Sequence, residues 1–69
     1  MKQIDARGLS CPMPMMLVQK EIKNTNPREL EVLVDDKCAV ENVTRLGNSQ
    51  GYKVECEAVE DEFTLRLKK

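Results

Sequence analysis

The chain has 69 residues, which is enough for one small domain and too few for two. Hydrophobic residues make up 41% of the sequence, but one Phe, one Tyr and no Trp mean that the core must be built from aliphatic side chains and Met. We therefore expect residues 1–69 to form one thin, two-layer domain without a deep substrate pocket.

The charge is nearly balanced, with 11 basic against 12 acidic residues and a formal net charge of -1. A balanced chain lacks the positive footprint of a nucleic-acid-binding or membrane-binding protein, so neither partner is expected. The sequence also contains no His, which is the commonest general base and a frequent metal ligand. This excludes most hydrolytic mechanisms, and we expect neither a metal nor another cofactor.

The longest unbroken apolar run, Met15–Val18, has four residues, far short of the roughly 20 that cross a bilayer. Cys11, Cys38 and Cys56 form no CxxC pair, and an odd number of cysteines argues against a closed disulfide framework. The sequence therefore predicts a cytoplasmic protein with reduced thiols.

The first half of the chain predicts a strand, a helix and a second strand. Lys2–Ala6 is a short strand that ends at a Gly turn. From Pro12 to about Asn24, apolar residues recur every three or four positions, which is typical of an amphipathic helix, and prolines are tolerated in its first turn. Leu30–Val34 is a short apolar run with β-branched residues, as expected for a central strand.

The second half predicts another helix and a hairpin. Asp35-Asp36 offers a capping carboxylate for a helix over residues 37–50, in which Gly47 is expected to cost about 1 kcal/mol relative to Ala. Residues 52–58 and 63–68 alternate in polarity across a four-residue connection, as in an antiparallel hairpin. The order is βαβαββ, and right-handed crossovers place both helices on one face of a mixed four-stranded sheet. We therefore predict an α+β fold, a two-layer α/β sandwich whose other face is polar.

Cys11 immediately precedes the predicted first helix, and the N-terminus of a helix is a position at which a cysteine becomes reactive. A thiol reacts as the thiolate, and the partial positive charge and unpaired N–H groups of a helix N-terminus favour that form. Pro12 and Pro14 stiffen the turn, and Arg7 in the same loop is expected to add positive potential. The alternative is a buried, inert Cys, because free Cys is among the most buried residue types. The residues alone do not decide between the two.

The run Asp5-Ala6-Arg7-Gly8-Leu9-Ser10-Cys11-Pro12-Met13-Pro14 resembles the TusA/SirA/YedF sulfur-carrier family, whose hallmark is Cys-Pro-x-Pro at the start of the first helix. The resemblance covers the whole chain, and residues 41–52 are most similar to the amino-terminal domain of YedF-type proteins associated with selenium metabolism. It implies a fold similar to the carboxy-terminal domain of translation initiation factor three. It also implies a carrier of sulfane sulfur rather than a turnover enzyme, with sulfurtransferase as the activity if one is assigned.

The resemblance assigns roles to individual residues. Cys11 maps onto the cysteine that holds sulfur as a persulfide, and Pro12 and Pro14 map onto the motif prolines. Sulfur is expected to come from a cysteine desulfurase or a rhodanese-like donor and to pass to an acceptor protein. We expect these partner proteins to dock at the edge formed by Arg7, Gly8, Pro12, Met13 and Pro14.

The chain departs from the family pattern at two places. Asp36-Lys37-Cys38-Ala39 stands where many members have Asp-Pro-Ala, which adds a thiol, and the turn Glu60-Asp61-Glu62 lacks the Gly often found there. Parallel strands begin their helices at one edge of a sheet, so Cys38 is expected near Cys11 but not bonded to it. Cys38 is then either a secondary thiol or simply a small residue in the first turn of the helix.

The remaining sulfur-bearing residues have structural interpretations. Cys56 falls on the strand positions that face the helices, so it is expected to be buried and inert. Met15 and Met16 are expected to fill the core, and Met13 between two prolines offers an exposed contact for a partner. A Cu(I) site at these methionines and Cys11 is the weaker alternative.

Two rival functions stand beside the sulfur relay. One is a regulatory or selenium-related binding module in which the thiol is incidental. The other is a thiol–disulfide redox protein that uses Cys11 and Cys38.

Overall fold

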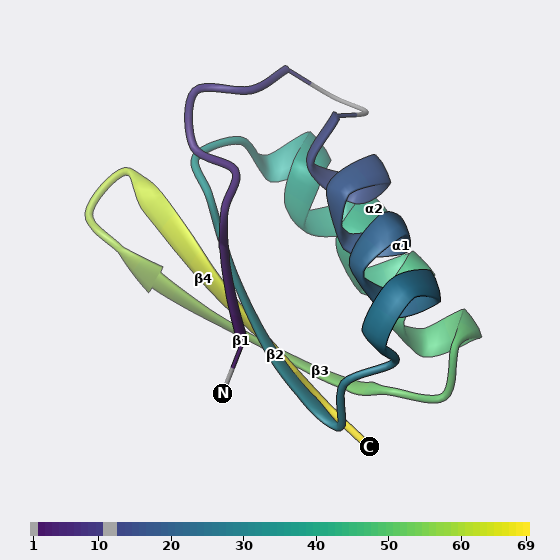
Figure 1. The fold of residues 1–69 in the computed structure, drawn as a ribbon. Coiled ribbons are helices and arrows are strands. Elements are labelled where there is room, and N and C mark those ends of the chain that lie inside the picture. Colours follow the sequence, from purple (N-terminus) through teal and green to yellow (C-terminus); the bar gives the residue numbers. More distant parts are fainter. Residues whose placement is uncertain (1, 11–12) are drawn as a thin grey trace.

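The computed structural model describes residues 2–10 and 13–69. Its elements follow one another as β1 (Lys2–Asp5), α1 (Met13–Thr25), β2 (Glu29–Val34), α2 (Lys37–Ser49), β3 (Lys53–Val59) and β4 (Glu62–Lys68). This confirms the predicted order βαβαββ, and Figure 1 shows both helices on one side of the sheet. Within the described residues, no helix is long and apolar enough to cross a membrane.

The sheet has the strand order β1-β2-β4-β3. β1 and β2 are parallel and are joined through α1, while β4 pairs antiparallel with β2 on one side and with β3 on the other. Because β1 and β2 run in the same direction, α1 and α2 start at the same edge of the sheet (Figure 1). This confirms the predicted position of the helix starts, although Cys11 and Pro12 themselves lie outside the described residues.

The core lies between the sheet and the helices, and Tyr52 is its one aromatic member among the buried residues described. The buried hydrophobic residues are Ala6, Val18, Ile22, Leu30, Val32, Val34, Ala39, Val43, Tyr52, Leu65 and Leu67. The Tyr52 hydroxyl donates a hydrogen bond to the Pro27 carbonyl. This bond provides the polar end of a buried ring with the partner that it needs.

Helix α2 is held close to the sheet. It begins at the predicted cap, where the Asp36 carboxylate accepts a hydrogen bond from the backbone N–H of Cys38 at 3.0 Å. Further along, a Cβ atom at Gly47 would lie 2.6 Å from Val54 Cγ2 and 2.9 Å from Leu67 Cδ2. The missing side chain of Gly47 therefore permits the close approach of α2 to β3 and β4.

The β3–β4 hairpin is tighter than predicted. Val59 pairs with Glu62, so the turn consists of Glu60 and Asp61 instead of the expected four residues. Glu60 has a φ of 57°, in the left-handed region that normally favours glycine. The missing Gly of this turn is thus replaced by a glutamate with a strained backbone.

The prediction that Cys56 is buried is wrong. Cys56 pairs with the buried Leu65 and so lies on the helix-facing side of the sheet, yet it is exposed. β3 is one of the two edge strands, and the hairpin extends beyond the helices (Figure 1). Alternation along a strand fixes the face on which a side chain lies, but it does not determine whether a second layer covers that face.

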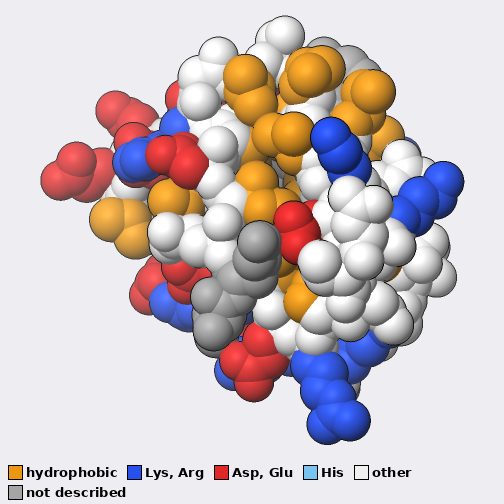
Figure 2. All heavy atoms as spheres, in the orientation of Figure 1, with side chains coloured by type: hydrophobic (Ala, Val, Ile, Leu, Met, Phe, Trp, Pro, Cys, Tyr) orange, Lys and Arg blue, Asp and Glu red, His pale blue; other side chains and the backbone are white. Residues whose placement is uncertain are grey.

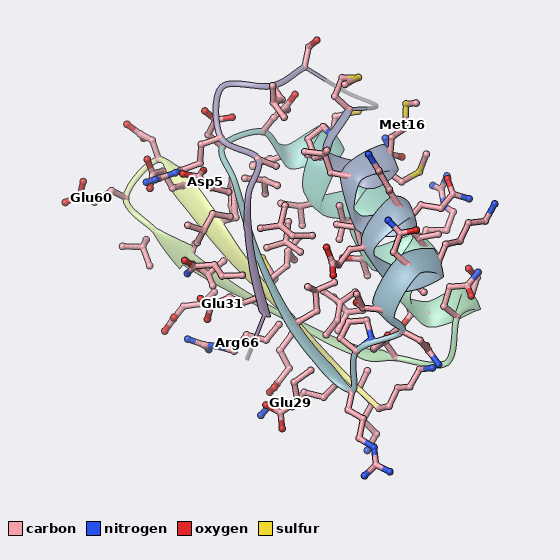
Figure 3. All side chains as sticks on the ribbon, in the orientation of Figure 1. Asp5, Met16, Glu29, Glu31, Glu60 and Arg66 are labelled. Atoms are coloured by element: carbon pink, nitrogen blue, oxygen red, sulfur yellow. The ribbon has the colours of Figure 1, made fainter. Side chains whose placement is uncertain are left out.

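The opposite face of the sheet is polar, as predicted. One row of contacts crosses all four strands: Gln3 Nε2 donates to Glu31 at 2.6 Å, and Arg66 contacts Glu31 and Glu57 at 3.3 Å each. Figure 3 shows Glu31 and Arg66 on the side of the sheet away from the helices. The ion pairs and the exposed side chains leave this face solvated, which accounts for much of the charged fraction of the chain.

Candidate functional site

The segment that leads from β1 to Cys11 is a loop held against the sheet. Ala6 is buried, and its N–H donates to the Leu33 carbonyl at 2.8 Å, so the pairing with β2 continues one residue past β1. Gly8 then turns the chain with a φ of 80°, which a residue without Cβ adopts freely. The Ser10 carbonyl accepts a hydrogen bond from the Met13 N–H at 2.9 Å, which connects the loop to the first turn of α1.

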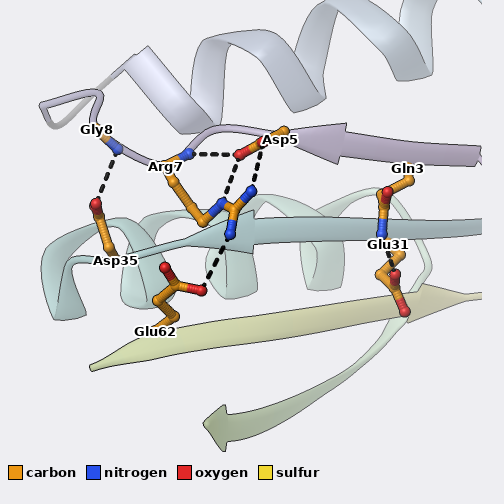
Figure 4. A network of polar contacts seen from close by, with 7 residues as sticks. All are labelled: Gln3, Asp5, Arg7, Gly8, Glu31, Asp35 and Glu62. Atoms are coloured by element: carbon orange, nitrogen blue, oxygen red, sulfur yellow. Dashed lines mark hydrogen bonds and ion pairs between the residues drawn. The ribbon is translucent and has the colours of Figure 1, made fainter. Parts of the chain in front are cut away.

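A network of polar contacts ties this loop to three strands (Figure 4). Arg7 donates to both carboxylate oxygens of Asp5, from Nε at 2.9 Å and from Nη2 at 2.8 Å. Its Nη1 lies 3.2 Å from Oε1 of Glu62, the first residue of β4. The Gly8 N–H donates to Asp35 Oδ2, just past the end of β2, at 2.9 Å. We call the contacts among Asp5, Arg7 and Glu62 the arginine clasp.

The arginine clasp also favours the charged forms of Asp5 and Arg7. Side-chain and backbone hydrogen bonds from Arg7 lower the pKa of Asp5 to about 2. Hydrogen bonds to Asp5 and then Glu62 raise the pKa of Arg7 further above its ordinary value. Asp5 and Arg7 therefore remain ionised through the whole range in which a thiol titrates. The expectation that Arg7 supplies spare positive potential has no support in this geometry, because its guanidinium is engaged by two carboxylates.

The predicted docking residues have different degrees of exposure. Arg7, Gly8 and Met13 are exposed, and Met13 retains 43% of its accessible surface. Pro14 is fully buried, so its assignment as a residue that contacts a partner is corrected: its ring packs on the inner side of α1. Pro12, like Cys11, lies outside the described residues.

The prediction that Met16 fills the core is also wrong, because Met16 is 50% exposed, whereas Met15 is partly buried against the core. The inner row of α1 is Pro14, Val18 and Ile22, spaced by four residues. A residue two positions from this row lies about 200° around the helix and points outward. Figure 3 shows Met16 projecting from the start of α1 away from the sheet.

The outward side of α1 forms a shallow apolar groove with basic residues beside it. The groove has a volume of about 410 Å³, and its lining includes Met13, Met16, Leu17, Lys20 and Lys23. Figure 2 shows hydrophobic side chains gathered over the start of α1, with Lys or Arg side chains beside them. We call this surface the α1 groove. The periodicity that predicted the helix contained the signal for it, because Met16 shares a face with Lys20 and Lys23.

Cys38 is exposed in the first turn of α2, at the edge of the sheet where α1 also begins. Asn42 Nδ2, one helical turn later, lies 3.8 Å from Cys38 Sγ as a hydrogen-bond donor. A role as a secondary thiol stays a prediction. Among residues 2–10 and 13–69, no three His, Cys, Asp or Glu side chains are grouped so that they could hold a metal ion.

Comparison with known proteins agrees with the fold and with the family resemblance of the sequence. The family model described as sulfurtransferase TusA matches residues 2–69. A "putative sulfur carrier protein" of Methanocaldococcus jannaschii is 38% identical over 71 residues, covering 100% of this chain and 95% of the relative. Another of the same description from Archaeoglobus fulgidus is 36% identical over 63 residues, covering 88% of this chain and 82% of the relative.

Among solved structures, the SirA-like protein of Desulfitobacterium hafniense superposes with a TM-score of 0.85 at 26% identity, covering 97% of this chain and 95% of that one. This similarity confirms the predicted two-layer α+β fold. The chain belongs to the TusA family. The family and the names of the relatives indicate a TusA-like sulfur carrier.

Proposed function

We propose that the protein relays sulfane sulfur in the cytoplasm, from a donor protein of the cysteine desulfurase or rhodanese-like class to an acceptor protein, on Cys11. The Cys11 thiolate attacks the terminal sulfur of the donor persulfide, and the S–S bond of the donor breaks. The cysteine sulfur of the donor leaves as a thiolate, and the new S–S bond between Cys11 and the transferred sulfur makes Cys11 a persulfide. The sulfane sulfur moves without net oxidation, because one thiol and one persulfide are present before and after the step.

The observation that carries this proposal is the position of Cys11 in the sequence, two residues before α1 begins at Met13. The Met13 N–H is bonded to the Ser10 carbonyl and Pro14 has no N–H, so the helix dipole and the remaining N–H groups of the first turn are what favour a nearby anion. A thiolate and a persulfide anion both satisfy that requirement. The arginine clasp leaves no spare cation from Arg7, so the helix start is the source of stabilisation that we propose for the thiolate.

The α1 groove is the surface that we propose for docking of the donor, next to the loop that leads to Cys11. Met13 and Met16 offer flexible apolar contacts, which adapt to more than one partner. Lys20 and Lys23 add positive charge at the same surface. A complementary donor surface therefore carries an apolar side chain surrounded by carboxylates.

Sulfur loading tests the proposal directly. The protein is incubated with a cysteine desulfurase and L-cysteine, and peptides are mapped by mass under non-reducing conditions. We expect Cys11 to gain the mass of one sulfur atom, while Cys56 and a Cys11→Ser variant do not. Loading of all three cysteines to the same extent, or of none, would contradict the relay.

Alkylation kinetics measure the basis of that reactivity. Cys56 is an exposed cysteine on a strand, so it serves as an internal control for exposure without a helix start. We expect the Cys11 rate to reach its midpoint below the ordinary thiol pKa of about 8.5. If Cys11 and Cys56 showed the same midpoint, the proposed role of the helix start would be refuted.

The α1 groove can be tested with a pair of variants. Met16→Ser should raise the KM for loading about 10-fold, because exposed apolar anchors dominate small interfaces, and should leave kcat unchanged. Val59→Ser is the matched control, since Val59 is equally exposed, at 53%, but lies at the end of β3. Equal KM values for the two variants would remove the α1 groove from the docking surface.

One observation favours a second candidate, because Cys38 is exposed at the edge of the sheet where both helices begin. Cys11 and Cys38 would then form a disulfide as an external disulfide is reduced to two thiols. Treatment with oxidised glutathione and mass analysis separates the candidates. Loss of two hydrogens with both cysteines in one cross-linked peptide would support the redox function, and sulfur gain on Cys11 in a Cys38→Ser variant would support the relay.

A further inference from the structure

The arginine clasp links two segments that are far apart in the sequence. Asp5 is the last residue of β1, Arg7 lies in the loop that follows, and Glu62 comes 55 residues after Arg7, at the start of β4. The hairpin turn Glu60-Asp61 immediately precedes Glu62, so the clasp joins the loop to the turn end of the projecting hairpin. Figure 4 shows the Arg7 side chain lying across the ends of the strands, between the two carboxylates.

The energy of such contacts is small, but their geometry is specific. The side chains of Asp5, Arg7 and Glu62 are 55%, 41% and 51% exposed, and exposed ion pairs contribute little to global stability. Arg7 nevertheless uses Nε, Nη1 and Nη2 at once, a planar arrangement that a single ammonium cannot reproduce. The clasp therefore fixes the direction of the loop more than it stabilises the fold.

Beyond Arg7, the described residues of the loop make a small number of contacts, among them the packing of Leu9 against the core. Past Ala6, Gly8 adopts a positive φ with open space around it, and its N–H is bonded to Asp35. Cys11 is four positions after Arg7 in the sequence. The described part of the loop ends at Ser10, whose carbonyl accepts a hydrogen bond from the Met13 N–H, so an orientation set at Arg7 reaches the start of α1 through this bond.

We propose that Arg7 is a positioning residue, which through the arginine clasp holds the loop preceding Cys11 in the orientation needed for sulfur transfer. Its charge is used within the clasp and does not act on the thiol or on a docking partner. This inference rests on the relay through Cys11 and adds to it a residue that acts through the loop. The ionised state of Asp5 and Arg7 throughout the range of thiol titration keeps the clasp closed at every pH where the carrier reacts.

The two roles of Arg7, geometric and electrostatic, predict opposite results for Glu62→Gln. If Arg7 acted through its charge, removal of the Glu62 carboxylate would release positive potential, favour the Cys11 thiolate and speed transfer. If Arg7 positions the loop, Glu62→Gln loosens the clasp and slows transfer. Arg7→Lys gives the complementary comparison, because it keeps the charge and loses the three-nitrogen geometry.

The chain offers a matched control. Glu57→Gln removes a carboxylate of similar exposure, 57%, from a 3.3 Å ion pair with Arg66 on the same hairpin, at the open face of the sheet. It changes the net charge as Glu62→Gln does but leaves the arginine clasp intact. Circular dichroism and denaturant midpoints of all variants check that each one is folded.

The experiment measures the kinetics of loading by a cysteine desulfurase with L-cysteine, together with hydrogen exchange of the loop. For Arg7→Lys and Glu62→Gln we expect kcat to fall about 10-fold with an unchanged KM, since misalignment of a reacting group costs rate rather than binding. We also expect exchange at residues 6–10 to rise about 10-fold, as local opening becomes easier. Glu57→Gln should match the parent in both measurements.

Three outcomes would overturn the inference. Faster loading by Glu62→Gln would show that Arg7 acts through its charge, and parental kinetics in Arg7→Lys would show that the three-nitrogen geometry is not needed for transfer. Parental exchange at residues 6–10 in both variants would show that the clasp does not hold the loop, whatever the loading kinetics. A parent protein that accepts no sulfur refutes the relay instead, and the exchange measurement still decides whether the clasp orders the loop.

Discussion

Replacement of Gly47 by Ala should destabilise the protein, although helix propensity alone predicts that it stabilises it. Gly47 lies inside α2, where Ala is favoured by about 1 kcal/mol in the absence of tertiary contacts. The sequence alone therefore predicts that Gly47→Ala stabilises the protein. The structure predicts the opposite, because the new methyl group would be placed 2.6 Å from Val54 Cγ2 and 2.9 Å from Leu67 Cδ2.

Neither neighbour can move away easily. Val54 is β-branched and has few alternative rotamers, and Leu67 is fully buried in the core. Forcing an extra methyl group into a packed core costs about 1 to 3 kcal/mol, so after the gain of about 1 kcal/mol in propensity the net destabilisation is up to about 2 kcal/mol. With a urea m-value of about 1 kcal/mol per molar, the midpoint of unfolding should fall by up to about 2 M.

Urea unfolding followed by circular dichroism provides the assay, and Asn48→Ala provides the control. Asn48 is the next residue of α2 and is exposed, so its replacement changes helix propensity without a clash and should raise the midpoint slightly. If Gly47→Ala raised the midpoint as Asn48→Ala does, the close packing of α2 on β3 and β4 would be refuted.

Two further predictions concern the hairpin turn and Tyr52. Glu60→Gly should raise the free energy of unfolding by about 0.5 kcal/mol, because relief of the strain in the left-handed backbone exceeds the entropy cost of Gly. Asp61 has no positive φ, so the control variant Asp61→Gly should lower the free energy of unfolding. Tyr52→Phe should cost about 1 kcal/mol through loss of the hydrogen bond to the Pro27 carbonyl. Burial raises the pKa of Tyr52 in the folded protein, so the parent should lose stability as the pH rises above the unfolded value of about 10, and Tyr52→Phe should lose less. A phenolate absorbance that appears at pH 10 before unfolding would contradict this.

The sequence by itself determined the elements and the motif. Hydrophobic periodicity, Pro near the start of α1 and the Asp36 cap are local signals, because each depends on residues within one or two turns of the chain. They were sufficient for the order βαβαββ, and the handedness of crossovers then placed both helices on one face. The Cys-Pro-x-Pro run similarly indicated the TusA family without any coordinates.

Burial was decided by the tertiary structure. Met16 and Cys56 were both expected to be buried, and both are exposed, for different reasons. The buried residues of α1 form a single row, and Met16 lies on the other side of the helix. Cys56 faces the helix side of the sheet, as predicted, but β3 is an edge strand and the hairpin extends past the helices.

The tertiary structure also decided which groups meet across long sequence separations. Nothing in the sequence around Arg7 indicates that Glu62 is its partner, because pairing of β4 with β2 brings the start of β4 to the edge where β1 ends. In the same way, the sequence predicts only that Gly47 weakens its helix, whereas the structure shows that Val54 and Leu67 leave no room for a side chain there. Local sequence sets the conformation of each segment, whereas the role of a side chain depends on what the packed sheet places beside it.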